Sequence, residues 1–171
     1  MKKYLRIFGL VLLAALVVIQ FIRPAKNQSG AGSGEITAAY EVPAPVMAIM
    51  KPACYDCHSN NTRYPWYSNL QPVAWWLDSH VQDGKRHLNF SEFTTRKIAV
   101  QNHKFEEIIE TVEEGEMPLE SYTWTHGDAR LTPEQRETVV AWAKAQMEIL
   151  SQKYPADSLV LRRGPSPQAS R

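Results

Sequence analysis

Hydrophobic positions recur along the middle of the chain with the spacing of helices that bury one face. A stripe at i, i+3, i+4, i+7 and i+8 follows Pro72, which suits a first helical position. This stripe consists of Val73, Trp76, Leu77, His80 and Val81. A second helix is predicted over residues 95–114, with Gly115 as its stop. Its buried face is expected to hold Phe105, Ile108, Ile109 and Val112.

The last predicted helix has the clearest start. Residues 132–135, Thr-Pro-Glu-Gln, supply an N-cap hydroxyl, a proline at the first helical position and a glutamine that completes a capping box. The apolar pattern then runs through Val139, Val140, Trp142, Ala143, Met147 and Leu150. A shorter helix is expected over residues 45–50, with Pro52 ending it. Because no run of β-branched residues indicates a strand, we predict an all-α domain.

The amino terminus has a different pattern, in which basic residues precede an apolar run. Three basic residues among the first six come before residues 7–22, which are interrupted only by Gly9 and Gln20. That pattern is typical of an export signal or a membrane anchor. Sixteen helical residues span about 24 Å, somewhat less than the ~30 Å hydrocarbon core of a bilayer. We expect residues 1–26 to be an uncleaved, single hydrophobic anchor helix, with cleavage as the alternative.

Composition divides the rest of the chain into three segments. Residues 27–39 are expected to be a flexible linker, because their first eight positions, NQSGAGSG, contain nothing that could be buried. Residues 40–154 are expected to form the domain, and residues 155–171 a flexible tail. From residue 35 onward the chain holds 14 basic and 18 acidic side chains, a net charge of −4. That balance argues against nucleic-acid binding, which calls for a concentrated basic face.

Both cysteines of the chain lie in one pentapeptide, Cys54-Tyr55-Asp56-Cys57-His58. This C-x-x-C-H motif attaches haem covalently in c-type cytochromes, since each thiol can add to one porphyrin vinyl group and the histidine can reach the iron. A zinc site would need a second close pair of ligands, and no second cysteine pair exists. A thioredoxin-like dithiol would lie within a βαβ pattern, which is missing here. We therefore expect one haem c, held by Cys54, Cys57 and His58.

The motif also bears on location. Bacteria attach haem to such motifs on the outer side of the inner membrane. Basic residues ahead of the apolar run favour a cytoplasmic amino terminus, although Arg23 and Lys26 beyond it weaken that charge argument. We expect the domain to lie in the periplasm, held at the bacterial inner membrane by residues 1–26.

The second axial position of the iron leaves four possibilities open. Met117 precedes Pro118, which favours an extended backbone at the methionine, so that a loop could present its thioether inward. His80 shares the apolar stripe after Pro72 and is expected to face inward. His126 lies on a predicted loop, and the position could also be open or water-bound. We favour Met117 as the metal ligand opposite His58, with His80 and His126 as alternatives.

Aromatic and acidic residues cluster around these candidates. The rings could wall the porphyrin or simply fill the core, and they belong to Tyr64, Trp66, Tyr67, Trp75 and Trp76. Seven glutamates lie in the acidic stretch Glu106 to Glu120, with no basic residue among them. We expect this stretch either to dock a basic redox partner protein or to be a solvated helix face.

Two segments, residues 54–93 and 115–143, resemble the haem-binding domain family found in bacterial, often membrane-anchored proteins. The first begins CYDCHSNNTRYPWYSN, and the second begins GEMPLESYTWTHGDARL. The resemblance covers residues 40–147 and implies haem attached at Cys54 and Cys57, with His58 on the iron. The order of C-x-x-C-H motif, Met-Pro loop and closing helix also resembles the single-haem cytochrome c fold.

These expectations combine into a membrane-anchored, periplasmic, mono-haem c-type cytochrome that transfers single electrons. We expect an electron carrier or haem-binding module more than an enzyme, because the family is named for binding and implies no reaction. A haem peroxidase or a gas or redox sensor is the alternative if one axial site is open. A thiol-disulfide oxidoreductase that uses the C-x-x-C pair is the other alternative.

Overall fold

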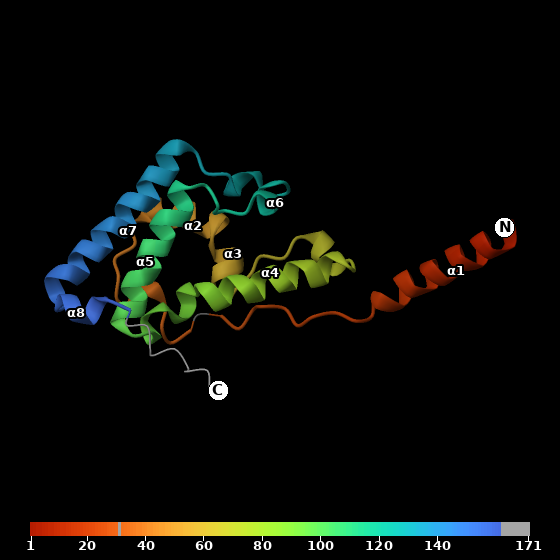
Figure 1. Ribbon diagram of the computed structural model, residues 1–171, viewed down its shortest axis with the longest axis horizontal. Coiled ribbons are helices and arrows are strands. Elements are labelled where there is room, and N and C mark those ends of the chain that lie inside the picture. Colours follow the sequence, from red (N-terminus) through yellow and green to blue (C-terminus); the bar gives the residue numbers. More distant parts are fainter. Residues whose placement is uncertain (31, 162–171) are drawn as a thin grey trace, which may run out of the picture.

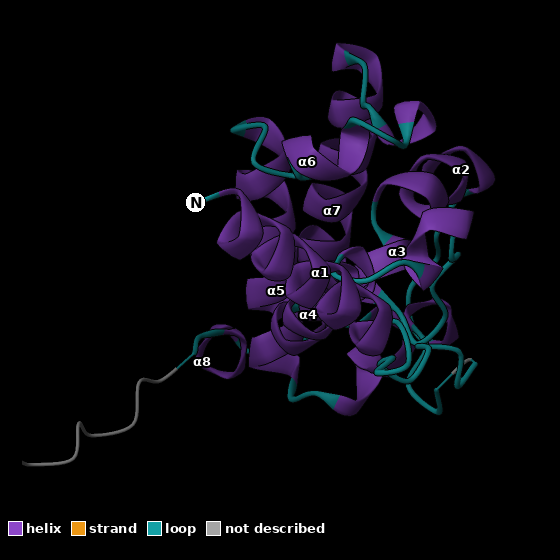
Figure 2. Cartoon of the chain, turned by 90° about the vertical axis from the view of Figure 1, so that its right-hand side faces the viewer, coloured by secondary structure: helices purple, strands orange, loops and turns teal. Residues whose placement is uncertain are grey.

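A computed structural model describes residues 1–30 and 32–161 of the chain. All regular elements in these two ranges are helical, which confirms the predicted all-α class (Figure 1, Figure 2). The α-helices are α1 (Lys2–Ile19), α2 (Ala44–Ala53), α3 (Tyr55–His58), α4 (Val73–His87), α5 (Ile98–Glu113), α6 (Glu120–Thr123), α7 (Pro133–Lys153) and α8 (Ala156–Leu159). The 3₁₀ helices are η1 (Ile36–Ala38), η2 (Trp66–Asn69), η3 (Phe90–Thr95) and η4 (Gly127–Ala129).

The hydrophobic core lies where α2, α5 and α7 pack together. Phe105 of α5 is fully buried, and its ring meets Trp142 of α7 edge-on, with 5.6 Å between the ring centroids. The rings of Tyr40 and Phe93 lie 5.0 and 5.1 Å from that of Phe105. The Trp142 indole donates to the Glu41 carbonyl at 2.9 Å, which ties the segment before α2 to α7. The two long helices predicted from the apolar spacing therefore bury their faces against each other.

The predicted start of α7 and the predicted stop of α5 are confirmed. Thr132 and Gln135 form the capping box at the start of α7, where the Thr132 hydroxyl accepts from the Gln135 N–H at 3.2 Å. Gly115 follows the end of α5 with a φ of +77°, the left-handed conformation that glycine adopts without strain. The start of α5 falls at Ile98, later than predicted, because residues 90–95 form η3 instead.

The short helix before the C-x-x-C-H motif is longer than predicted. We expected Pro52 to end it, but α2 continues to Ala53. The lost proline N–H removes one bond of the last turn, and the Cys54 N–H closes that turn by donating to Met50 at 2.8 Å. The motif therefore starts directly at the end of a helix and not on a loop.

The stripe on α4 is not packed into the core as its spacing predicts. Ala74 and Val81 are the buried residues of α4, while Trp76 remains 46% exposed. The stripe faces a cavity in place of another helix, as described below. Apolar spacing reports that a face avoids water, and it does not report whether protein or a ligand covers that face.

Residues 27–30 and 32–39 lie against the domain, although the composition of this segment predicts a flexible linker. Asn27 is 8% exposed, and its amide donates to Ser59 O at 2.8 Å and to the Thr62 hydroxyl at 2.9 Å. Ile36 is fully buried. A Cβ on Gly32 would clash with the backbone of η3, so this glycine allows a close approach of two backbones. Hydrogen bonds to the domain therefore allow the polar side chains of this segment to be buried.

The carboxyl-terminal tail predicted over residues 155–171 contains one more ordered turn. Helix α8 packs beside α5, and the Asn102 side-chain amide donates to the Leu159 carbonyl at 3.4 Å. Leu159 also packs on the hydrophobic core. Residues 162–171 lie outside the described part of the chain.

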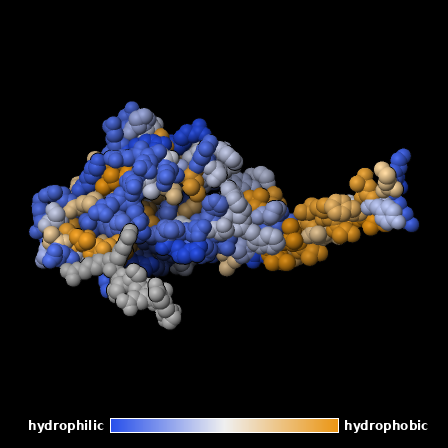
Figure 3. Space-filling view, in the orientation of Figure 1, coloured by the Kyte–Doolittle hydropathy of each residue, from blue (hydrophilic) through white to orange (hydrophobic). Residues whose placement is uncertain are grey.

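Helix α1 stands apart from the domain as a rod of hydrophobic, largely exposed side chains (Figure 3). Its end is hydrogen-bonded to the domain, because the Gln20 amide donates to Gln71 O at 3.2 Å and the Gln20 side-chain oxygen accepts from Gln71 N–H at 3.0 Å. Within residues 1–30 and 32–161, no helix has both the length and the apolar character needed to cross a membrane. The prediction of a membrane-spanning helix in residues 1–26 therefore has no support, although a helix does precede the domain.

Candidate functional site

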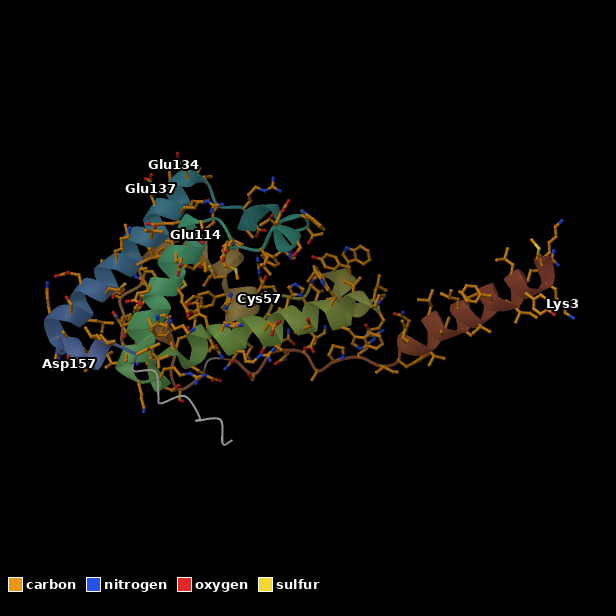
Figure 4. The ribbon with its side chains drawn as sticks, viewed as in Figure 1. Lys3, Cys57, Glu114, Glu134, Glu137 and Asp157 are labelled. Carbon is orange, nitrogen blue, oxygen red and sulfur yellow. The ribbon has the colours of Figure 1, made fainter. Side chains whose placement is uncertain are left out.

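The last four residues of the C-x-x-C-H motif form the short helix α3, which directly follows α2, and Cys57 lies near the middle of the domain (Figure 4). Cys54 is the last residue of the α2 turn, and its carbonyl accepts from the N–H of Cys57 at 3.3 Å and of His58 at 2.9 Å. Both thiols are free and half-buried. One turn of helix therefore presents the two sulfurs and the imidazole from a single, hydrogen-bonded unit.

The ring of His58 is held by the backbone of α4. Its Nδ1 lies 2.9 Å from Gly84 O and 3.0 Å from Leu88 O. Since carbonyl oxygens only accept hydrogen bonds, Nδ1 carries the proton and Nε2 keeps its lone pair. Burial lowers the pKa of His58, so the ring is neutral near pH 7. A neutral imidazole with its other nitrogen anchored in this way is the form that binds metals.

The two thiols are protonated in the absence of a bound group. Burial raises the pKa of Cys54 to about 12, with a further increase from the nearby Cys57. Burial and the Asp56 carboxyl raise the pKa of Cys57 to about 11. Reactive dithiols of oxidoreductases have lowered pKa values, because the thiolate is the nucleophile. This environment is therefore the opposite of a thiol redox site.

Asp56, between the two cysteines, fixes the motif through its buried carboxyl group. Arg63 donates to it from the backbone N–H at 2.9 Å and from the guanidinium at 3.1 Å. The Tyr122 hydroxyl donates to Asp56 Oδ2 at 2.7 Å. Sequence reasoning did not single out Asp56, Arg63 or Tyr122. The only signal it could have used is an acidic residue inside the motif with an arginine seven positions later. Only the fold brings Tyr122 to them.

Three adjoining cavities are lined by a cysteine or the histidine of the motif. The first, of about 380 Å³, lies between α4 and residues 119–126. The second and third, of about 290 and 350 Å³, both reach His58. Cys57 lines the first two cavities and Cys54 lines the third. Since cofactor pockets commonly enclose about 300–1,000 Å³, these cavities leave room for a flat macrocycle beside both thiols.

The first cavity is walled by apolar and aromatic side chains. They include the α4 stripe, which explains why that stripe is apolar without being buried. Two of the five rings expected at a porphyrin wall, Trp66 and Trp75, do not line the cavities, whereas Trp124 does and was not anticipated. The other three expected rings, Tyr64, Tyr67 and Trp76, do line the first cavity, and the ring of Tyr122 joins them.

Met117 is the candidate axial ligand that shares most surroundings with His58. The two residues line the second and third cavities together. Gly115 ends α5, and the Met117 N–H then donates back to Thr111 O at 3.0 Å, which folds the loop over the helix end. The structure therefore brings Met117 to the motif across 59 residues of sequence.

The two histidine alternatives differ in how free their ring nitrogens are. His80 Nδ1 lies 2.8 Å from Trp76 O, which leaves Nε2 open, and His80 lines the first and second cavities. His126 Nδ1 lies 3.1 Å from Tyr122 O, and its Nε2 lies 3.3 Å from the Tyr67 hydroxyl. Because both nitrogens of His126 have partners, it is less suited to a metal than His80. His87 also lines the second and third cavities.

The acidic stretch Glu106 to Glu120 is partly neutralised. Glu107 lies 3.1 Å from His103 Nε2, and Glu113 pairs with Lys144 at 2.8 Å. In the described part of the chain, four members of the stretch form no ion pair, namely Glu110, Glu114, Glu116 and Glu120. These four remain as an uncompensated negative surface along the end of α5 and the loop after it.

The residues around the motif fit a haem, because two thiols, an anchored imidazole with a free Nε2 and an apolar cavity lie in contact with one another. A model of the haem-binding domain family matches residues 14–145. Comparisons with curated proteins and with solved structures gave no match. The matched range covers most of the chain and includes the motif, the cavities and Met117. This protein therefore belongs to the haem-binding domain family.

Proposed function

We propose that the protein is a mono-haem c-type cytochrome that transfers single electrons. In this proposal Cys54 and Cys57 would hold the haem through thioether bonds, and His58, through Nε2, and Met117 would bind its iron. Bound in this way, haem supplies an iron that cycles between its ferric and ferrous states. The observation that carries the proposal is the anchored ring of His58, whose Nδ1 is fixed by the carbonyls of Gly84 in α4 and of Leu88 just after it.

The chain's own residues have separate tasks in this proposal. The carbonyls of Gly84 and Leu88 set the tautomer and the orientation of His58, as second partners do for metal-binding histidines. Asp56 keeps the turn of the motif closed through Arg63 and Tyr122. The apolar walls exclude water from the cofactor, which favours a raised reduction potential.

Met117 favours electron transfer over the alternative of a haem peroxidase or a sensor. Those functions require an open axial site. Met117 lines both cavities that His58 lines, whereas His80 shares only one of them with His58. A thioether opposite an imidazole fills both axial positions and raises the reduction potential. The raised thiol pKa values speak against the third alternative, a thiol-disulfide oxidoreductase.

We also propose that α1 attaches the domain to the bacterial inner membrane and that the domain lies in the periplasm. Two observations support attachment: the apolar side chains of α1 are exposed along its length, and none of them is buried against the domain. The periplasmic side follows from where bacteria attach haem to such motifs. The acidic stretch would then face a basic redox partner protein, since opposite charge speeds association.

A pyridine haemochrome spectrum tests the cofactor. The full chain is produced in a bacterium with haem-attachment machinery, extracted with acidic acetone, and compared with Cys54→Ala and Cys57→Ala. We expect the colour to stay with the protein, with the spectrum of a doubly thioether-linked haem, and to shift or disappear in the two variants. A wild-type polypeptide that comes out colourless would remove the proposal.

A further inference from the structure

We infer that the end of the domain from which α1 emerges rests on a lipid surface, as a second membrane contact besides α1. This aromatic end consists of Phe21, Ile22, Trp66, Leu70 and Trp75. The inference rests on the proposed attachment of α1 and adds an orientation to it. The domain would not swing freely on a tether but would lie with one fixed face on the bilayer.

The aromatic end exposes large apolar side chains. Trp66 is 76% exposed, Phe21 84%, Leu70 47% and Trp75 39%. Trp66, Leu70 and Trp75 do not line the three cavities around the C-x-x-C-H motif, so the proposed haem would not cover them. Contiguous exposed apolar groups of this kind mark a contact surface. Indole rings in particular gather at the boundary between lipid and water.

Gln71 joins this surface to α1. Its side chain is buried, and its amide donates to Ile22 O at 2.6 Å while its side-chain oxygen accepts from the Trp75 N–H at 3.3 Å. Two further bonds connect Gln71 with Gln20 at the end of α1. The exit of α1 is therefore held against the start of α4. When α1 enters a lipid phase, Trp75 and its neighbours must lie at the surface of that phase.

Charge is arranged in agreement with a lipid surface. Arg23 and Lys26 follow α1 directly, and basic side chains next to a bilayer are attracted to its phosphate groups. Glu114 of the acidic stretch, together with Glu134 and Glu137, lies away from α1 (Figure 4). The part of the acidic stretch around Glu114 therefore faces away from α1 and would remain accessible above the membrane.

Hydroxyl-radical footprinting of the haem-loaded full chain tests the orientation. The chain is bound to vesicles of phosphatidylcholine and phosphatidylglycerol, labelled, and analysed by mass spectrometry. The reference is the full-chain variant Leu12→Asp/Leu16→Asp without lipid. We expect labelling of Trp66 and Trp75 to fall about fivefold on vesicles, while the exposed Ile149 at the other end of the domain keeps its labelling. Unchanged labelling of both tryptophans in the vesicle-bound chain would overturn the inference.

A second measurement uses the same α1 variant as a background. Adding Trp66→Ser and Trp75→Ser should weaken its residual sedimentation with vesicles by about tenfold, and the matched change Ile149→Ser should not. Equal sedimentation of the two variants would contradict the inference.

The haem spectrum of each sample separates the possible failures. Haem-loaded, vesicle-bound protein with unprotected tryptophans overturns only the orientation. Wild-type protein that does not bind vesicles removes the attachment by α1, and colourless protein removes the cytochrome proposal.

Discussion

Gly84 and Cys57 are in backbone contact. A Cβ on Gly84 would lie 2.7 Å from the Cys57 carbonyl oxygen and 3.0 Å from the Cys57 Cβ. The carbonyl of the same Gly84 accepts from His58 Nδ1 at 2.9 Å. One position of α4 therefore both lets the C-x-x-C-H motif approach and orients its histidine. That double role accounts for a glycine inside a helix, where it otherwise costs about 1 kcal/mol relative to alanine.

Gly84→Ala should destabilise the protein in spite of the better helix propensity of alanine. The added methyl group gains about 1 kcal/mol in the helix, whereas overlap with the rigid backbone of Cys57 costs roughly 1–3 kcal/mol. We expect a net loss in the free energy of unfolding, measured by urea denaturation, and a smaller fraction of chains with attached haem. Gly127→Ala is the control, since its Cβ would meet open space. Equal effects of the two variants would refute the role of Gly84.

Met117→Ala should change the axial ligation of the iron. We expect the far-red sulfur-to-iron absorption band of the ferric protein to disappear and the reduction potential to fall, because a thioether ligand raises it. Met147→Ala, a partly buried methionine on α7, should leave both unchanged. A ferric spectrum unaffected by Met117→Ala would transfer the assignment to His80, which His80→Ala then tests in the same way.

Tyr122→Phe should loosen the motif. The change removes the hydroxyl that donates to the buried Asp56 carboxyl at 2.7 Å, and hydrogen bonds to charged groups contribute roughly 1.5–3 kcal/mol. Tyr67→Phe removes an exposed hydroxyl bond to Thr125 and should cost less than about 1 kcal/mol. Thermal unfolding of the two variants measures the difference. If the two variants unfold at the same temperature, the hydrogen bond from Tyr122 to Asp56 stabilises the protein no more than the one from Tyr67 to Thr125.

The thiols of the haem-free chain should react slowly at neutral pH. Their folded pKa values, about 12 for Cys54 and about 11 for Cys57, lie above that of a free cysteine. Iodoacetamide should therefore label the folded chain at pH 8 on the order of 100-fold more slowly than the urea-unfolded chain. Because folding favours the protonated thiols, their contribution to the free energy of unfolding should be constant below pH ~8.5 and decline as the pH rises through that value. Equal labelling of both states would revive the thiol-enzyme alternative.

Electron transfer to a cationic partner should slow as salt rises. Exposed glutamates attract such a partner over distances that salt screens, with a Debye length of about 10 Å at 0.1 M. Replacing Glu114 and Glu120 by glutamine should lower the rate at low salt and flatten its salt dependence. The matched pair Glu148→Gln and Asp157→Asn lies on α7 and α8 and should have little effect. Rates that do not depend on salt would exclude docking at the acidic stretch.

Several features of the fold could be predicted because their causes are local. The capping box at Thr132, the stop at Gly115 and the apolar spacing of α5 and α7 each depend on residues within one or two turns. The glycines at 32 and 34 show the limit of such local reasoning. In the sequence they indicate a flexible linker, yet in the structure they lie in close contact with η3, where a side chain would not fit.

The candidate site also contains some residues that local sequence predicts and others that only the fold brings together. Cys54, Cys57 and His58 lie together in the sequence, so one motif was enough to name them. The hydrogen bonds that join Asp56 to both Arg63 and Tyr122 form only when α6 has folded onto α3, and no spacing in the sequence predicts them. The stripe on α4 was recognised as apolar, but its partner turned out to be a cavity.

The sequence by itself determined the helical class, the start of α7, the end of α5 and the haem motif, because capping, helical periodicity and thiol spacing act over a few residues. Only the tertiary structure decided that the apolar face of α4 lines a cavity, that Met117 and His58 line the same cavities, and that Gln71 holds the exit of α1 against the aromatic end. These relationships join residues far apart in the chain. They depend on how whole helices pack, and that packing minimises exposed apolar area over the entire domain, which no local window can evaluate.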